Sequence, residues 1–241
     1  MNLTPLKSQL INQNDDLILA IKKSLNRKKE KLKDGDILVI ASKVVAYNQG
    51  RLVKVKSKAE FKKIIKKEAD KVLADSEMSI TLKNKILIPN SGIDNSNTPK
   101  GEVVLWPKEP FNAAQQIRSD LIKECKLKKL GIVISDSHCQ PLRLGTTGIA
   151  IGWAGFKGVQ DERGAKDLFK KKMQYTQVAV ADNIASAANI MMGETNASIP
   201  FVLVRNLDVK WTSKKASEKD YSIDPKECIY KNLFITKLCT K

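Results

Sequence analysis

Three short polar segments each place an acidic residue among small residues that let a ligand approach closely. They are SGIDNSN (91–97, with Asp94), SDS (135–137, with Asp136) and MGETNAS (192–198, with Glu194). Carboxylates on turns rich in Gly, Ser and Asn suit a hard cation such as Mg²⁺ or Mn²⁺ that also binds phosphate oxygens. Each acid alone has an ordinary alternative as a helix cap or an Asx-turn, so both interpretations stay open at this point.

The segment ISDSHCQPLRLG (134–145) carries the single histidine of the chain, His138, beside Cys139. A zinc site is not expected because there is no second histidine and no paired-cysteine spacing. A Cys–His nucleophile is not expected either, because adjacent side chains seldom face each other. We therefore interpret Asp136 as the functional residue of this segment. His138 is expected to line the acceptor pocket or to be exposed.

Other ligand-binding patterns are weaker. The sequence has no GxxxxGK[ST] motif, and GTTGIAIG is not a GxGxxG fingerprint, which argues against a P-loop and a dinucleotide site. Arg143 and Arg163 are candidates for bidentate contact with phosphate or carboxylate, with structural ion pairs as the equal alternative. Asp182 is interpreted as a supporting acid on a helix or as a surface residue.

Hydrophobic periodicity predicts the elements that would hold these loops. Helices are expected over 17–25, 59–74, 110–126, 164–172 and 176–194, and strands over 85–89, 101–107, 129–135 and 199–207, with a β-rich run over 36–47 interrupted by Ser42 and Lys43 and a last helix or strand over 228–238. Asn14–Asp16 is expected to cap the first helix and Gly193 to end the fifth. Helices and strands do not alternate strictly. We therefore expect an α+β fold with mixed or antiparallel sheets.

Composition limits the classes of function. The 241 residues carry a net charge of +17, and most of the 43 basic residues are lysines on solvent faces of predicted helices, with few aromatic residues between them. This pattern favours a solvated surface over nucleic-acid binding, although it would attract a polyanionic small substrate. No apolar run reaches membrane-spanning length, the first residues do not resemble a signal peptide, and the four cysteines form no CxxC pair. A cytoplasmic protein is expected.

Five motifs occur in an order that resembles one family. They are GIDNSN, then GIVISDS followed by P.R.G and AIG..G, then DERGAKDL, then VAVADNIASAANIMMGE, then IPFVLVR. From about Asp15 to Arg205 this order resembles the coenzyme F420-0:L-glutamate ligases, the γ-glutamyl ligases of deazaflavin biosynthesis. The resemblance implies an enzyme that phosphorylates an acceptor carboxylate with a nucleoside triphosphate, GTP or ATP, so that the amine of L-glutamate can attack it. It also implies an α+β fold and a homodimer.

The resemblance also implies cofactors and site residues. Two divalent cations, Mg²⁺ or Mn²⁺, are expected, together with K⁺. Asp94 and Asp136 match the ligands of one metal, and Ser137, where the family usually has threonine, matches the second metal's ligands with Glu194. Asn97 and Ser42 match nucleotide contacts, and the nucleotide-binding segment corresponds to Met192, Gly193, Thr195, Asn196 and Ile199. Asp136 and Arg143 are the candidate catalytic residues. The catalytic domain is expected over residues 1–207, with residues 208–241 as an extension that packs on it or on a partner chain.

Several positions depart from the family pattern. A nucleotide-contacting lysine is replaced by Tyr47, a Gly-Arg pair by Cys139 and Gln140, and a helix glutamate by Asn183. The N-terminal Gly-Leu-Pro segment is not recognisable near Ser8–Ile11. These changes leave three hypotheses: a ligase acting on F420-0 or a related deazaflavin, a folate-type γ-glutamate ligase, and a non-catalytic protein of the same fold that binds nucleotide or nucleic acid.

Overall fold

The computed structural model describes residues 1–13 and 15–232. The elements in chain order are β1 (Asn2–Leu6), α1 (Leu17–Arg27), β2 (Asp36–Ala41), α2 (Ser42–Asn48), β3 (Leu52–Lys54), α3 (Lys58–Glu68), β4 (Lys71–Ala74), β5 (Ile80–Lys83), β6 (Ile86–Pro89), η1 (Asn90–Gly92), β7 (Glu102–Val104), α4 (Pro110–Cys125), β8 (Leu130–Cys139), β9 (Thr146–Ala154), β10 (Gln160–Asp161), β11 (Gln177–Val178), α5 (Val180–Met192), β12 (Phe201–Arg205) and η2 (Glu218–Asp220). None of the helices in this described part is long and apolar enough to cross a membrane.

A five-stranded mixed sheet in the order β1-β12-β2-β8-β9 forms the centre of the molecule. Only β2 and β8 are parallel, and the other neighbours are antiparallel. The expected α+β fold with mixed and antiparallel sheets is confirmed. Because β2 and β8 run in the same direction, the residues that follow β2 and the last part of β8 lie at the same edge of the sheet.

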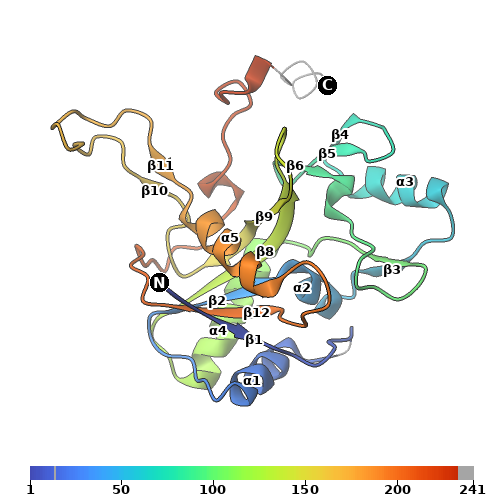
Figure 1. Cartoon of the computed structure of the whole chain (residues 1–241), viewed down its shortest axis with the longest axis horizontal. Helices are drawn as coiled ribbons and strands as arrows, with labels where there is room; N and C mark the ends of the chain where they lie inside the picture. Colours follow the sequence, from blue (N-terminus) through green and yellow to red (C-terminus); the bar gives the residue numbers. More distant parts are fainter. Residues whose placement is uncertain (14, 233–241) are drawn as a thin grey trace.

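Helices cover both faces of this sheet (Figure 1). On one face α1 and α4 bury a cluster that includes Ile21 and Leu121 against Leu38 and Ile132. On the other face α5 packs its small residues, such as Ala185 and Ala188, closely against the sheet. The alternating side chains of β2 and β8 therefore supply both cores, which fixes the strand register and the direction in which each polar side chain points.

A smaller unit beside the main sheet holds the loop of Asp94. It consists of α3, the β4-β5-β6 sheet and the β3-β7 ladder. A largely buried ion-pair network connects its parts: the Glu68 carboxylate binds the guanidinium of Arg51 at 2.6 Å and the ammonium of Lys83 at 2.8 Å. The Arg51 Nε also donates to the carbonyl of Trp106 at 3.0 Å, which links this network to the segment after β7.

Two further segments extend from the sheet. Residues 159–178 form a long arm around β10 and β11 that projects from the body (Figure 1). The chain after β12 returns to the α5 face, where Val209 is buried and Trp211 pairs with Phe156. Tyr221 stacks on Phe111 with ring centroids 6.0 Å apart. The segment after β12 therefore packs on the main sheet at least as far as Tyr221.

Several predicted elements are wrong in detail. Residues 42–47 are not β-structure but begin helix α2, because Val45 and Ala46 are buried on one side of that helix. The helix expected over 59–74 ends at Glu68, and Lys71–Ala74 form β4 instead, in which Val72 pairs with Thr81 and Ala74 with Ile80. The strand expected to end before Asp136 continues to Cys139, because β9 folds back on it as a hairpin.

The arm and the C-terminal part of the chain also bear on the predicted elements. Residues 164–172 form turns joined by the Lys166–Lys172 bridge, and the helix predicted there is wrong. Other expectations are confirmed: Asp16 caps α1 by accepting the amide of Leu19, and Gly193 follows the last residue of α5. Most of the last element predicted over 228–238 lies outside the described residues.

Candidate functional site

A cleft opens at the sheet edge where β2 and β8 carry their polar residues. It has a volume of ≈ 260 Å³ and lies between α2, the loop of Asp94, β8 and the segment that joins α5 to β12. Most of the residues predicted for the site line it: Ser42, Asp94, Asn97, Asp136, Ser137, Met192, Gly193, Glu194, Thr195, Asn196 and Ile199. The fold thus collects three acids that are far apart in sequence.

Asp94 carries an ion pair that the sequence did not suggest. The Nζ of Lys43, in α2, lies 2.7 Å from its Oδ2 and also donates to the carbonyl of Ser96 at 2.8 Å. The amide and hydroxyl of Ser96 both donate to the same carboxylate. Burial alone would raise the pKa of Asp94, but Lys43 and Ser96 outweigh it and hold the pKa below its ordinary value. Asp94 is therefore charged at neutral pH.

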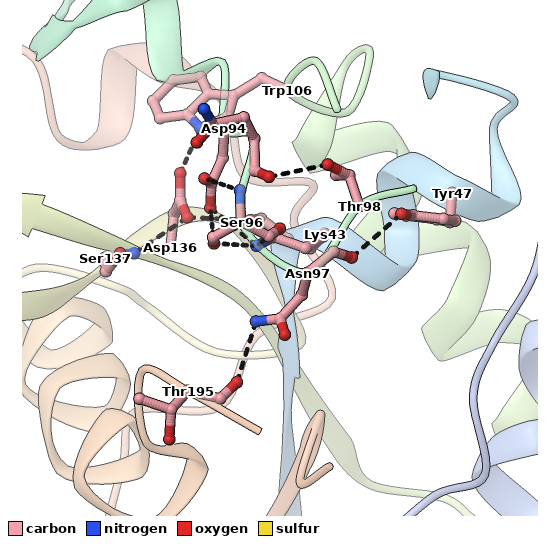
Figure 2. A network of polar contacts seen from close by, with 12 residues as sticks. Lys43, Tyr47, Asp94, Ser96, Asn97, Thr98, Trp106, Asp136, Ser137 and Thr195 are labelled. Carbon is pink, nitrogen blue, oxygen red and sulfur yellow. Dashed lines mark hydrogen bonds and ion pairs between the residues drawn. The ribbon is translucent and has the colours of Figure 1, made fainter. Parts of the chain in front are cut away.

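Asp136 is surrounded differently (Figure 2). Its Oδ1 accepts from the hydroxyl of Ser42 at 3.1 Å and from the amide of Ser137 at 3.0 Å, and its Oδ2 accepts from the indole Nε1 of Trp106. Burial nevertheless raises the pKa of Asp136 to about 6, against the lowering effect of these donors and of Lys43. The charged carboxylate is thus poorly compensated, which is the condition a bound cation relieves.

The segment after α5 forms the opposite wall of the cleft. The side-chain amide of Asn97 donates to the carbonyl of Thr195 at 2.9 Å, which ties the Asp94 loop to this wall (Figure 2). Glu194 accepts from the hydroxyl of Thr146 at 3.2 Å and from the side-chain amide of Asn189 at 2.9 Å. The hydroxyl of Tyr47 donates a hydrogen bond to the carbonyl of Asn97 at 3.2 Å. Tyr47, which stands where the family pattern has a lysine, therefore lies on the Asn97 side of the cleft.

The acids share the cleft without forming a finished metal cage. Among residues 1–13 and 15–232, no three His, Cys, Asp or Glu side chains lie close enough to hold a metal ion together. Mg²⁺ is commonly held by one or two carboxylates plus water and phosphate oxygens, so such a cage is not required. Ser135 adds a buried hydroxyl on the cleft lining that has no hydrogen-bond partner among the described residues. The oxygen-rich lining therefore suits a cation that is shared with a phosphorylated ligand.

The remaining candidates lie elsewhere. Arg143 is exposed in the turn between β8 and β9 and does not line the cleft. Arg163 is also exposed, on the arm, where it pairs with Asp161 at 2.6 Å. Arg163 therefore forms the structural ion pair that was the alternative to a contact with phosphate or carboxylate. Asp182 is half-buried at the start of α5, outside the cleft, and accepts the amide of Ala150. His138 is half-buried in β8 and does not line the cleft, and burial lowers its pKa.

Sequence reasoning missed Lys43 and Trp106. Lys43 was interpreted only as an interruption of a strand, although its place beside the predicted contact Ser42 could have drawn attention to it. Trp106 stood in no motif and is 30 residues from Asp136, so only the fold brings the two together.

The sequence model of the F420-0:Gamma-glutamyl ligase family matches residues 5–206 of the chain. The coenzyme F420:L-glutamate ligase of Methanococcus maripaludis (strain C7) is 36% identical over 236 residues, covering 90% of this chain and 93% of the relative. The enzyme of the same name from Methanocaldococcus jannaschii is 35% identical and covers 81% of this chain and 84% of its own. The enzyme of the same name from Archaeoglobus fulgidus is 33% identical, and the match covers 83% of this chain and 85% of the relative.

Proposed function

Because the chain belongs to the F420-0:gamma-glutamyl ligase family, we propose that its cleft joins L-glutamate to the carboxylate of a deazaflavin acceptor at the cost of a nucleoside triphosphate. An oxygen of the acceptor carboxylate attacks the γ-phosphorus and the nucleoside diphosphate leaves. The amine of glutamate then attacks the acyl carbon, phosphate leaves, and the amine proton is released. The observation that carries this proposal is the convergence of Asp94, Asp136, Glu194 and Lys43 on one cleft.

The chain's own groups suit the first step. Bringing a carboxylate to a triphosphate requires positive charge and positioned donors, and most of the catalysis is electrostatic and positional. The ammonium group of Lys43 supplies positive charge in the cleft beside Asp94. We expect this group to contact phosphate when a nucleotide enters. Asn97 and residues 192–199 are proposed to bind the nucleotide. The lining does not distinguish GTP from ATP, and both are kept as the co-substrate.

The donor set also fits divalent cations. We propose that Asp94 and Asp136 hold one Mg²⁺ or Mn²⁺ ion, that Ser137 and Glu194 hold a second, and that K⁺ is a third ion. Such ions would offset charge on the transferred phosphoryl group. A cation on Asp94 would compete with Lys43 for the charge of this carboxylate, so the Lys43 ion pair is expected to weaken when the cation binds.

The acceptor is the open part of the proposal. Product masses test it: the protein is incubated with L-glutamate, Mg²⁺ or Mn²⁺, and GTP or ATP, with F420-0 or monoglutamyl tetrahydrofolate in separate reactions. A glutamyl addition on F420-0 supports the proposal, and an addition on the folate alone identifies the folate-type alternative. No addition and no nucleotide consumption would contradict both and favour the non-catalytic binding protein.

We further propose a homodimer in the cytoplasm, formed through the arm. Leu168 and Phe169 near its tip are almost fully exposed, as are Leu142 and Leu144 in the turn between β8 and β9. Apolar side chains gathered on projecting segments are typical of interaction surfaces.

Replacing Leu168 and Phe169 together by serine is expected to convert a dimer to a monomer, since burying each such side chain contributes about 1.5–3 kcal/mol. Light scattering of the purified chain measures the mass. Leu19→Ser, on an exposed position of α1, is the control and should leave the mass unchanged. A parent protein with the mass of one chain would contradict the proposed dimer.

A further inference from the structure

Trp106 donates a hydrogen bond to Asp136, and the proposed function gives this tryptophan no role. Trp106 follows β7 and is 2% exposed, and its indole Nε1 donates a hydrogen bond to Oδ2 of Asp136. Figure 2 shows the ring directed at the carboxylate from the side opposite Ser137. A hydrogen bond to a carboxylate in a half-buried setting is among the stronger kinds, so this contact orients the acid.

The surrounding backbone leaves the indole little freedom. A Cβ placed on Gly92 would collide with the indole of Trp106 at its Nε1, and Gly92 has φ +70, so only glycine fits there. On the other side, the carbonyl of Trp106 accepts from Arg51, which is itself fixed by Glu68. The ring is therefore clamped between η1 and the ion-pair network of the smaller unit.

The donors on Asp136 can be counted against its acceptor capacity. An ionised carboxylate offers two oxygens with about four lone-pair positions in total. Ser42 and the Ser137 amide occupy both positions on Oδ1, and Trp106 occupies one on Oδ2. One position remains, on Oδ2. While these donors are in place, Asp136 can bind a cation through a single oxygen only.

We propose that Trp106 is a positioning residue: by holding Oδ2 it keeps the carboxylate of Asp136 turned so that Oδ1 stays on Ser42 and Ser137, which leaves Asp136 a one-oxygen ligand and favours Mg²⁺ and Mn²⁺ over Ca²⁺. Ca²⁺ takes six to eight oxygens and often binds both oxygens of a carboxylate, whereas Mg²⁺ needs compact octahedral geometry with few carboxylates. The inference rests on the proposed metal site. It adds Trp106, which belongs to none of the sequence motifs that identified that site.

The test is Trp106→Phe, which keeps a buried ring and deletes the N–H. Mn²⁺ binding to the full chain is followed by electron paramagnetic resonance, and Ca²⁺ affinity by competition against Mn²⁺. The Mn²⁺ dissociation constant is expected to rise about tenfold or more, as for the loss of other groups that orient metal ligands. Without the indole the carboxylate can turn away from Ser42 and Ser137 and offer both oxygens to Ca²⁺. Ca²⁺ should therefore lose less affinity than Mn²⁺, so the ratio of the Ca²⁺ to the Mn²⁺ dissociation constant falls.

A matched control separates this role from packing. Trp153 is also 2% exposed but belongs to the α5-face core, so Trp153→Phe trims an equally buried ring away from Asp136. This control should leave the ratio of the Ca²⁺ to the Mn²⁺ dissociation constant unchanged. An unchanged ratio in Trp106→Phe would overturn the inference while the metal site stands. A parent protein that binds no Mn²⁺ at all would overturn the metal site itself, so the two failures are distinguishable.

Discussion

Asp136→Asn is expected to lower the rate of glutamyl transfer by more than about 100-fold while the protein remains folded. The change removes the charge proposed to hold a cation, and even groups that only orient metal ligands are worth about 10–100-fold. The folded protein does not depend on this charge, since burial disfavours it and raises the pKa of Asp136 to about 6. The measurement is the rate of glutamyl product formation, alongside circular dichroism to verify the fold.

Asp182→Asn is the matched control for this prediction. Asp182 is also an acid whose pKa burial raises, but it lies outside the cleft and only accepts the amide of Ala150, which an asparagine oxygen can still do. Its activity should stay within a few-fold of the parent. If Asp136→Asn transferred glutamate as fast as this control, the assignment of Asp136 as a metal ligand would be wrong.

Glu68→Gln is expected to destabilise the protein by about 3–5 kcal/mol, because it leaves Arg51 and Lys83 facing each other without their shared carboxylate. All three side chains are less than one-seventh exposed, so solvent cannot take the place of the lost partner. Urea unfolding gives the change in free energy. The network also supports the segment that carries Trp106, so a loss of Mn²⁺ affinity is expected alongside.

The same network gives a pH dependence. Burial would raise the pKa of Glu68, but Lys83 and Arg51 outweigh it and the pKa is lowered from its ordinary value of 4.5. The stabilisation is therefore fully present above that value and is lost as the pH falls through the lowered pKa of the folded state. Stability should drop less steeply below pH 4.5 in Glu68→Gln than in the parent. Glu124→Gln, which breaks the exposed Lys22–Glu124 pair, is the control and should leave the free energy of unfolding nearly unchanged.

Much of the main sheet could be predicted from local pattern. The apolar runs of β8 and β12 are nearly continuous because both faces of these strands are buried, and α1 has both a capping aspartate and a helical apolar stripe. The mistakes occurred where tertiary contacts override propensity. Residues 42–47 favour a strand locally, yet they form α2 because Val45 and Ala46 are buried on one side of the helix.

The arm shows a second limit. A lysine-rich segment around Leu168 has helical composition, but Gly164 and Lys170 both take positive φ and the chain turns back on itself. No local pattern distinguishes these turns from a short helix. Val72 and Leu73 illustrate the same limit, because helical spacing continues past Glu68 although the chain becomes extended at Ala69.

The acids of the site were predictable and their partners were not. Motif order identified Asp94, Asp136 and Glu194, and the fold brings all three to one cleft. Lys43 and Trp106 contact these acids across 51 and 30 residues, and such pairings depend on how α2 and the segment after β7 pack. Arg143 was a candidate because a guanidinium can bind phosphate or carboxylate, and the structure places it outside the cleft.

Transfer of oxygen-18 tests the central claim most directly. The acceptor is labelled in its carboxylate, the full reaction is run with L-glutamate and the preferred nucleotide, and the released phosphate is analysed by mass spectrometry. If an acyl phosphate forms, one labelled oxygen moves into phosphate for each glutamyl product. Product formation with unlabelled phosphate would contradict phosphorylation of the acceptor carboxylate.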